Sequence, residues 1–425
     1  MRNIVIVGGG FAGTTLVQSL QRRLPEGWRL LLLSEESYTT FNPMLAEVVG
    51  AAVFPEHVVA PIRQMIDAPR TQFVMGRALE VDFARRCLRA STLAGLQEIP
   101  FEHLVLAVGT RANTTLVPGL AEHALPLKLV GDALHIRNRV LQRLARIELE
   151  HDPMARRRLG HLIVIGGGFS GVEVAGSLSD FLRGALRFYP RVARDELKVT
   201  LLQDGERLLP ELPASLGVSA ARSLAARGVD VRLGARAVRV EADGVMLADG
   251  ARLDASTVVC TIGTRANPFV EQLDLPLQRG RIVTERDLLV TGRPGVWALG
   301  DCALVHNGDT LAPPTAQFAV AEAQVLARNL LAAIEQRPTV AFSHRSRGMM
   351  ATTGHLKGVA QIGRLRFSGL PAWLLWRAYY LLRMPTAGRK LRIWVEWTWA
   401  MAFAADITHL RFTRTAEADA DATPP

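Results

Sequence analysis

The sequence has few cysteines, and their positions exclude several classes of protein. Among its 425 residues the only cysteines are Cys87, Cys260 and Cys302, and no two of them form a CxxC pair. A disulfide framework, a structural zinc site and a dithiol redox centre are therefore not expected, and we predict no metal site. We expect Cys260 and Cys302 to be small, buried apolar side chains.

Long hydrophobic runs and an N-terminal signal are also missing. No stretch reaches the roughly 18 uncharged apolar residues that a membrane-spanning helix needs, and Met1 and Arg2 lead directly into an apolar strand. With 49% hydrophobic and 21% charged residues, the composition is that of an ordinary folded protein. We expect an intracellular protein with two or three domains, because the chain is too long for a single core.

The excess of positive over negative charge is confined to the C-terminal part of the chain. The net charge is +10, and between Ser343 and Thr415 twelve Lys and Arg residues stand against only Glu396 and Asp406. Five of the seven tryptophans lie in the same segment. We therefore predict that residues 336–425 form a separate module.

Two segments of the chain have nearly the same sequence, NIVIVGGGFAGTTLVQSL at 3–20 and HLIVIGGGFSGVEVAGSL at 161–178. Each combines an apolar strand, a GxGxxG turn and a helical pattern, which is typical of a dinucleotide-binding unit. The first glycine makes the turn, the second lets a diphosphate approach, and the third allows close packing of helix and strand. The candidate binding residues are Gly8, Gly10, Phe11, Ala12 and Gly13 in the first unit, and Gly166, Gly168, Phe169, Ser170 and Gly171 in the second.

Each unit should end its second strand with an acidic residue that binds a ribose hydroxyl. In the first unit we predict Glu35, with Ser34 and Glu36 as alternatives if the register differs. In the second unit the strand ends at Gln203, with Asp204 behind it. An amide does not repel the 2′-phosphate of NADPH, so the choice between NADH and NADPH is left open.

A further strand near the end of the glycine-rich region should complete the first unit. The segment PGVWALGDCA, residues 294–303, ends an apolar run with Gly300 and Asp301, which suit the ribityl and phosphate oxygens of a flavin. The flavin domain is then discontinuous. Two dinucleotide sites without a dithiol fit the transfer of hydride from a nicotinamide in one site to a flavin in the other.

A second pair of similar segments marks the point where the chain leaves each dinucleotide-binding unit. LVLAVGTRAN at 104–113 contains Gly109, and VVCTIGTRANP at 258–268 contains Gly263. We predict that Gly109 contributes to the flavin site and Gly263 to the nicotinamide nucleotide site.

Together these motifs resemble the type II NADH dehydrogenases (NADH:quinone oxidoreductases) among the flavoproteins with two dinucleotide-binding domains. The resemblance extends over nearly the whole chain, including YTTFNPMLAEVV at 38–49, PPTAQFAVAEA at 313–323, GLPAWLLWRAYYL at 369–381 and WVEWTWAMAFAADITHL at 394–410. It implies FAD bound non-covalently in the first unit and NADH or NADPH as substrate in the second. It also implies that hydride passes to the flavin, which then reduces a membrane quinone.

The resemblance implies a catalytic role for Glu173, in the helix of the second unit where the first unit has Thr15. In similar enzymes this acid lies near the nicotinamide and the flavin, where a carboxylate can orient the carboxamide or couple to a proton path. The alternative is an acid in the first helical turn that complements the helix dipole.

The resemblance also implies a glutamine motif, AQxxxQ, on the quinone side of the flavin. Ala316 and Gln317 match it, whereas the second glutamine is replaced by Ala321, with Glu322 beside it. This departure leaves open a different quinone geometry, a different lipophilic acceptor or slow turnover.

The tail contains two amphipathic aromatic segments, at 372–384 and 389–407, that are too short to span a bilayer. Tryptophan and tyrosine at headgroup depth, with arginine toward anionic lipid, would hold them at a membrane surface. The alternative is that the aromatics pack on the flavin domain or on a homodimer mate. No nucleic-acid-binding pattern is present, and residues 416–425 are expected to be disordered.

We therefore predict an α/β fold with two interleaved Rossmann-like FAD- and NAD(P)-binding domains and a C-terminal amphipathic membrane-associated module. The flavin domain should comprise 1–115 and 285–335, the nucleotide domain 116–284 and the module 336–425. The predicted function is a respiratory-chain NAD(P)H:quinone oxidoreductase that does not pump protons, bound peripherally to anionic lipid on the cytoplasmic face of a bacterial plasma membrane. The alternatives are a dehydrogenase with a soluble or protein acceptor and a membrane-bound redox-sensing scaffold. The quinone and the oligomeric state are left open.

Overall fold

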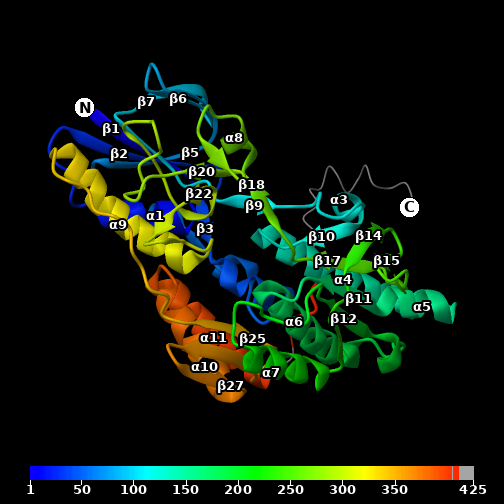
Figure 1. Cartoon of the computed structure of the whole chain (residues 1–425). Helices are drawn as coiled ribbons and strands as arrows, with labels where there is room; N and C mark the ends of the chain where they lie inside the picture. The colour runs from blue at the N-terminus through cyan, green and yellow to red at the C-terminus, as the bar shows by residue number, and fades with distance from the viewer. Residues whose placement is uncertain (404, 411–425) are drawn as a thin grey trace.

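The computed structural model describes residues 1–403 and 405–410, and it contains two sheets built around parallel strands (Figure 1). The first has the order β21-β8-β1-β2-β5-β6-β7 and the second the order β10-β17-β11-β12-β13. The strands of the first sheet are β1 (Arg2–Val7), β2 (Trp28–Ser34), β5 (Thr71–Asp82), β6 (Cys87–Thr92), β7 (Gly95–Pro100), β8 (His103–Leu106) and β21 (Val296–Ala298). Those of the second are β10 (Ala124–Pro126), β11 (His161–Ile165), β12 (Lys198–Leu202), β13 (Val229–Arg232) and β17 (Thr257–Cys260).

Both sheets confirm the predicted interleaved α/β fold. In each sheet the strand before the glycine-rich turn lies between two parallel partners, β2 and β8 for β1 and β12 and β17 for β11. The late strand β21 pairs with β8, so the first sheet is completed only after the chain has built the second. Cys260 and Cys302 are buried and free, as predicted.

The helices pack against these sheets and against one another. They are α1 (Phe11–Leu20), α2 (Leu45–Val49), α3 (Leu120–His123), α4 (Val130–Leu149), α5 (Pro153–Gly160), α6 (Phe169–Ala185), α7 (Ala214–Ala225), α8 (Pro268–Glu271), α9 (Ala316–Ile334), α10 (Leu370–Arg383) and α11 (Ala387–Ala402). The smaller strands are β3 (Tyr38–Thr40), β4 (Val59–Pro61), β9 (Thr110–Ala112), β14 (Ala237–Glu241), β15 (Gly244–Leu247), β16 (Arg252–Asp254), β18 (Thr264–Ala266), β19 (Leu277–Gln278), β20 (Arg281–Val283), β22 (Ala303–Leu304), β23 (His306–Asn307) and β24 (Thr310–Leu311).

The similar segments 104–113 and 258–268 pair with each other at their ends. Strands β9 and β18 form an antiparallel ribbon in which Arg111 lies opposite Arg265. Beyond β18, Val270, Leu273 and Ile282 pack in the core of the first sheet. We therefore propose that the boundary of the nucleotide domain lies at about residue 266 rather than at 284.

The third glycine of each fingerprint packs directly on the carbonyl oxygen of the first. A Cβ atom on Gly13 would lie 1.9 Å from the oxygen of Gly8, and one on Gly171 would lie 1.7 Å from the oxygen of Gly166. Gly8 and Gly166 have φ angles of +116° and +112°, which side chains disfavour. Glycine is therefore required at these positions, and it lets each helix begin at the carboxyl end of its sheet.

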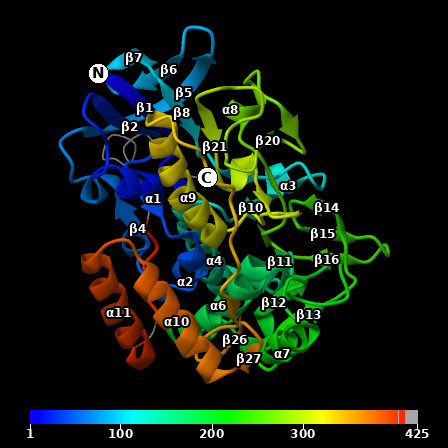
Figure 2. The same ribbon diagram turned by 60° about the vertical axis from the view of Figure 1, so that its left-hand side comes forward.

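The C-terminal module consists of a three-stranded antiparallel sheet followed by two helices. Its strands are β25 (Met349–Thr352), β26 (Gly358–Ile362) and β27 (Leu365–Ser368). Figure 2 shows α10 and α11 side by side at the edge of the molecule, with α11 outermost. None of the helices in residues 1–403 and 405–410 combines the length and the apolar character that crossing a membrane requires. The stretch predicted to be disordered, 416–425, lies outside the described residues.

The tryptophans of this module divide between the interior and the surface. Trp373, Trp376 and Trp397 are buried, whereas Trp394 is 55% and Trp399 60% exposed. Trp376 and Trp397 belong to one core with residues of α2, α4 and α6. The buried tryptophans are therefore compatible with packing of the tail on the body. The two exposed tryptophans are compatible with contact with a membrane surface.

The glycine contact predicts different outcomes for two substitutions in the same helix. Gly171→Ala should lower the free energy of unfolding by about 2 kcal/mol or more, because its Cβ overlaps a fixed carbonyl oxygen. Gly184→Ala is the matched control: no atom lies within 4 Å of its Cβ position, and alanine should stabilise the helix by about 0.5–1 kcal/mol. Urea unfolding of both variants measures the difference, and equal stabilities would contradict the contact.

Candidate active site

The first glycine-rich turn leaves open space over the carboxyl ends of β1, β8 and β21. A Cβ atom on Gly10 would meet no atom within 4 Å. Gly10 is also the N-cap of α1, and no side chain caps the helix there. The first N–H groups of α1 therefore face this space, which is the arrangement that binds a diphosphate.

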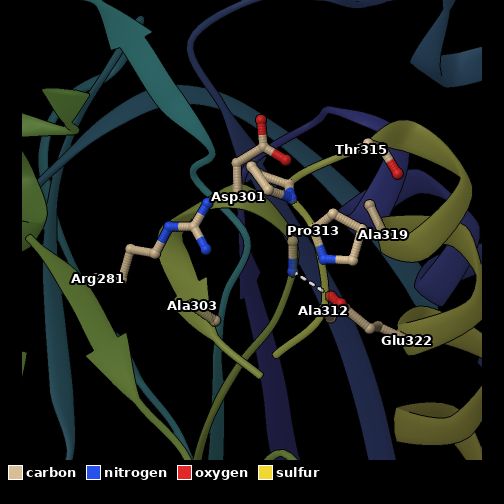
Figure 3. A pocket seen from close by; sticks show the side chains of 10 residues that line it. Arg281, Asp301, Ala303, Ala312, Pro313, Thr315, Ala319 and Glu322 are labelled. Atoms are coloured by element: carbon tan, nitrogen blue, oxygen red, sulfur yellow. Dashed lines mark hydrogen bonds between the residues drawn. The ribbon is translucent and has the colours of Figure 1, made fainter. Parts of the chain in front are cut away.

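The loop after β21 completes this first site. Gly300 has a φ of +74°, and its Cβ position lies 3.3 Å from the Cβ of Ala12 at the start of α1. Its N–H donates to Glu322 Oε2 at 2.7 Å, the bond drawn in Figure 3. The predicted residues Gly300 and Asp301 thus lie beside the first fingerprint, and Ala316 and Gln317 begin the adjacent helix α9.

Glu322 anchors the Gly300 loop. It follows Ala321, which replaces the second glutamine of the motif. Its side chain is almost fully buried, and burial raises its pKa to about 7 despite the hydrogen bond from Gly300. Ala321 is partly buried against the first core. It is therefore Glu322, the residue after the motif, that binds the Gly300 loop.

Lys128 also belongs to the first site and has no counterpart among the residues predicted from the sequence. Its Nζ lies 3.8 Å from Asp301 Oδ2 and donates to Thr110 Oγ1 at 3.2 Å. Lys128 follows β10 in the second unit, so no local pattern connects it with Asp301. A cation at this position suits an anionic or electron-rich ligand.

The register of the strands assigns equivalent residues in the two units. The N–H of the first glycine of each turn donates at 2.8 Å to Leu33 in the first unit and to Leu202 in the second. The pairs that follow, Ser34–Glu35 and Gln203–Asp204, therefore occupy equivalent positions. In both units the acid stands two residues after the leucine that accepts from the glycine N–H, Glu35 after Leu33 and Asp204 after Leu202.

The second unit uses Gln203 to close its own turn. Gln203 Oε1 accepts a hydrogen bond of 2.8 Å from the N–H of Gly167, whereas Asp204 is exposed. Gly168, like Gly10, has open space at its Cβ position and caps a helix without a side-chain bond. Gly263 instead packs on the segment between β9 and α3, because its Cβ position lies 2.1 Å from Leu116 Cδ1.

Glu35 lies at the edge of the first site among arginines. Its carboxylate is 3.6 Å from Arg77 Nε and 3.4 Å from Arg111 Nη2. Arg111 lies two residues after Gly109, whose Cβ position is open. Glu35 is therefore on the same edge of the sheet as the first turn and remains a candidate for ribose binding.

Glu173 is buried against the C-terminal module. Its Oε1 accepts hydrogen bonds from the N–H of Thr352 at 3.1 Å and from Trp376 Nε1 at 3.0 Å. The residue is only 7% exposed, and desolvation raises its pKa to about 8. It lies beyond the first turn of α6, which contains no acidic residue, so the structure corrects the interpretation of Glu173 as a first-turn acid that complements the helix dipole.

A chain of aromatic contacts joins the two fingerprint helices through α10. Phe11 at the start of α1 lies 5.5 Å from Phe41, and Phe41 lies 5.8 Å from Tyr380, between ring centroids. Tyr380 in turn lies 4.7 Å from Trp376, which binds Glu173. Helix α10 therefore contacts residues that lead to both glycine-rich turns.

A second buried carboxylate, Glu47 of α2, lies near Arg377 of α10. Burial raises the pKa of Glu47 and the guanidinium of Arg377 lowers it, while burial lowers the pKa of Arg377 to about 10. Arg377 stacks on Trp373 and Trp397, with its Cζ 3.7 and 4.7 Å from the ring centroids. The stacking joins α10 to α11, and the attraction to Glu47 links α10 to α2.

The residues present fit two dinucleotides. Each turn provides an uncapped helix N-terminus, a glycine with open space above it and a polar pair after the next strand. In the part of the chain that the structure describes, no group of three His, Cys, Asp or Glu side chains could hold a metal ion.

Comparison with known proteins gives a consistent result. Residues 2–323 match the model of the family described as pyridine nucleotide-disulphide oxidoreductase. The type II NADH:quinone oxidoreductase Ndh of Mycobacterium tuberculosis is 29% identical, over 93% of this chain and 87% of that protein. The internal alternative NAD(P)H-ubiquinone oxidoreductase A1 of Solanum tuberosum mitochondria is 28% identical, over 96% and 88%.

Two solved structures share the fold over nearly the whole chain. NDH2 of Plasmodium falciparum, in complex with NADH, superposes with a TM-score of 0.88 at 16% identity, over 96% of this chain and 99% of that chain. The sulfide:quinone oxidoreductase of Aquifex aeolicus superposes with a TM-score of 0.70 at 14% identity, over 94% and 92%. The similarity to NDH2 includes the C-terminal module.

The burial of Glu173 predicts a pH dependence that Glu173→Gln should remove. Its pKa rises from about 4.5 in the unfolded chain to about 8, so its contribution to stability is complete below pH 4.5 and is lost as the pH rises through 8. Between about pH 6 and pH 9 the wild type should lose on the order of 3 kcal/mol relative to Glu173→Gln, because about two pH units of this range lie below the folded pKa, at about 1.36 kcal/mol per unit. Urea unfolding at each pH measures this difference, and parallel pH profiles would show that Glu173 is not a buried, protonated group.

Proposed function

The chain belongs to the pyridine nucleotide-disulphide oxidoreductase family, and we propose that it is an FAD-dependent NAD(P)H:quinone oxidoreductase. It is an oxidoreductase, and its relatives are named for the reduction of quinone or ubiquinone by NADH or NADPH. One observation carries the proposal. Two open diphosphate cradles occur in one chain, and a single tail helix, α10, contacts residues leading to both.

The chain's own residues would hold the two nucleotides in defined ways. The N-terminus of α1 with Gly10 binds the diphosphate of FAD, Glu35 its ribose, and Asp301 with Lys128 the middle of the molecule. Gly168 and the start of α6 bind the diphosphate of NADH. Bound FAD supplies a carrier that takes up hydride from the nicotinamide and passes two electrons to the acceptor.

The reaction also needs a proton, since NADH, one proton and a quinone yield NAD⁺ and a quinol. Glu173 has a pKa of about 8 and so holds a proton at neutral pH, between α6 and the module. We propose that Glu173 takes part in this proton supply. The enzyme would reduce its quinone without pumping protons.

The choice of nucleotide follows from the residues after β12. Gln203 carries no charge and is engaged with the N–H of Gly167, so it does not repel a 2′-phosphate. Asp204 is exposed and one residue further from the turn. We propose that NADH is a substrate and that NADPH is accepted as well.

We further propose that α10 and α11 bind the protein to an anionic membrane surface, on the cytoplasmic side of a bacterial plasma membrane. The exposed apolar side chains of these helices include Leu374, Leu382, Leu391, Trp394, Val395 and Trp399. Arg383 and Arg392 are exposed beside them. Apolar and aromatic side chains next to basic ones are typical of an interfacial helix, and a quinone acceptor dissolves in such a membrane.

Stopped-flow spectroscopy of the FAD-loaded protein tests the proposed reaction. NADH should bleach the flavin absorbance in the absence of oxygen, and a short-chain quinone should restore it. NADPH in place of NADH should bleach it too. Reduction without reoxidation by quinone would favour a soluble or protein acceptor, and failure of both nucleotides to reduce the flavin would favour a redox-sensing scaffold.

Vesicle co-sedimentation tests the membrane surface. The double variant Trp394→Ser and Trp399→Ser should bind vesicles with anionic lipid at least about tenfold more weakly, because burying about 100 Å² of one indole contributes about 2.5 kcal/mol. Leu93→Ser, in the β6–β7 turn where the leucine is 87% exposed, is the control and should bind like the wild type. Unchanged binding of the double variant would refute the anchor.

A further inference from the structure

Helix α11 is attached to the rest of the molecule by few contacts. Of its 16 residues only Ile393 and Trp397 are buried. It packs mainly on α10 and on the 3₁₀ turn Pro55–His57, and Figure 2 shows it at the edge of the molecule. A segment with few buried apolar contacts opens more easily than the core of a protein. Helix α11 can therefore leave its place while the rest of the chain stays folded.

One pair of side chains holds α11 against the first domain. His57 Nδ1 lies 2.7 Å from Glu396 Oε1, and the N–H of Phe54 donates to the same oxygen at 3.4 Å. Only 21% of the His57 side chain and 13% of the Glu396 side chain are exposed. A hydrogen bond to a carboxylate is stronger than one between neutral groups. Among residues 1–403 and 405–410, no other side chain of α11 bonds to the first domain.

The polar groups around this pair are incompletely satisfied. The buried side-chain atoms at this junction that make no hydrogen bond are Arg377 Nε, Thr386 Oγ1, Arg389 Nη1, Glu396 Oε2 and Trp397 Nε1. Leaving buried polar atoms unpaired is unfavourable, and water can satisfy them once the helix moves away. The docked position of α11 is therefore only weakly favoured over a released one.

The outer face of α11 is apolar as well. The large side chains that are 50–62% exposed on this helix are Leu391, Trp394, Val395, Trp399 and Met401. While α11 is docked, a lipid surface can contact this face only. When α11 is released, lipid can also contact Ile393 and Trp397. Because a ligand shifts a protein toward the state that it binds better, a membrane surface favours release.

We propose that α11 is a releasable membrane helix and that the His57–Glu396 pair holds it docked until the protein meets an anionic lipid surface. The inference rests on the proposed membrane surface of α10 and α11 and adds a conformational step to it. After release Glu396 lies four residues from Arg392 on the same helix, a spacing at which opposite charges attract. Helix α10 stays docked, because its Trp376 binds the buried Glu173.

Hydrogen exchange of the FAD-loaded full chain, followed by mass spectrometry without lipid, tests the role of the pair. His57→Ala leaves the sequence of α11 intact. In this variant the amides of α11 should exchange about tenfold faster than in the wild type, because a larger fraction of the helix is released. The amides of α6 should keep the wild-type rate. An unchanged rate in α11, or an equal increase in α6, would refute the local release.

Two further variants make the exchange result specific. His57→Gln keeps a side-chain donor for Glu396, so its α11 rate should lie between those of the wild type and His57→Ala. Glu56→Ala changes the exposed neighbour of His57 and is the matched control. It should exchange like the wild type, and an increase as large as that of His57→Ala would refute the assignment to His57.

Binding to vesicles of phosphatidylcholine and phosphatidylglycerol tests the membrane step. If release is about tenfold more frequent in His57→Ala, its Kd for the vesicles should fall by up to about tenfold, although a basic side chain has been removed. A wild type that does not bind the vesicles would refute the proposed membrane surface and this inference with it. A wild type that binds them, with an equal or lower affinity in His57→Ala, would refute the inference alone.

Discussion

The contact between the third glycine of each turn and the carbonyl oxygen of the first is the constraint on which the nucleotide sites depend. With less than 2 Å between that oxygen and the position of a Cβ atom, only glycine lets the helix start directly above the strand. The helix N-terminus then lies over the carboxyl edge of the sheet, where its free N–H groups face solvent. Because the same contact occurs twice, the chain contains two equivalent cradles.

The C-terminal module completes this arrangement by contacting residues of both units. Helix α10 reaches the first unit through Tyr380 and Phe41, and the second through Trp376 and Glu173. Electrostatic attraction between Glu47 of α2 and Arg377 adds to these contacts. A buried carboxylate without partners would be strongly destabilising, so Glu173 requires Thr352 and Trp376 in place. The module is therefore part of the core as well as a surface element.

The difference between Thr15 and Glu173 follows from what each helix packs against. Helix α1 lies along the largely apolar α9. Helix α6 lies against β25 and α10, which supply a backbone N–H and an indole N–H. The duplicated unit thus carries an acid only where a third element satisfies it, and that acid has a pKa close to the neutral range.

The sequence by itself determined the two dinucleotide units, the late strand that completes the first sheet and the distinct composition of the tail, because these features rest on local patterns. GxGxxG between strand and helix, the paired returns at Gly109 and Gly263, and the clustering of charge and tryptophan can each be identified without knowledge of distant contacts. Only the tertiary structure showed that Lys128 lies near Asp301, that Glu322 binds the Gly300 loop and that Trp376 binds Glu173. It also divided the tryptophans between core and surface and matched Ser34 to Gln203. These contacts join residues far apart in the chain, or depend on strand register, and no spacing within one segment encodes either.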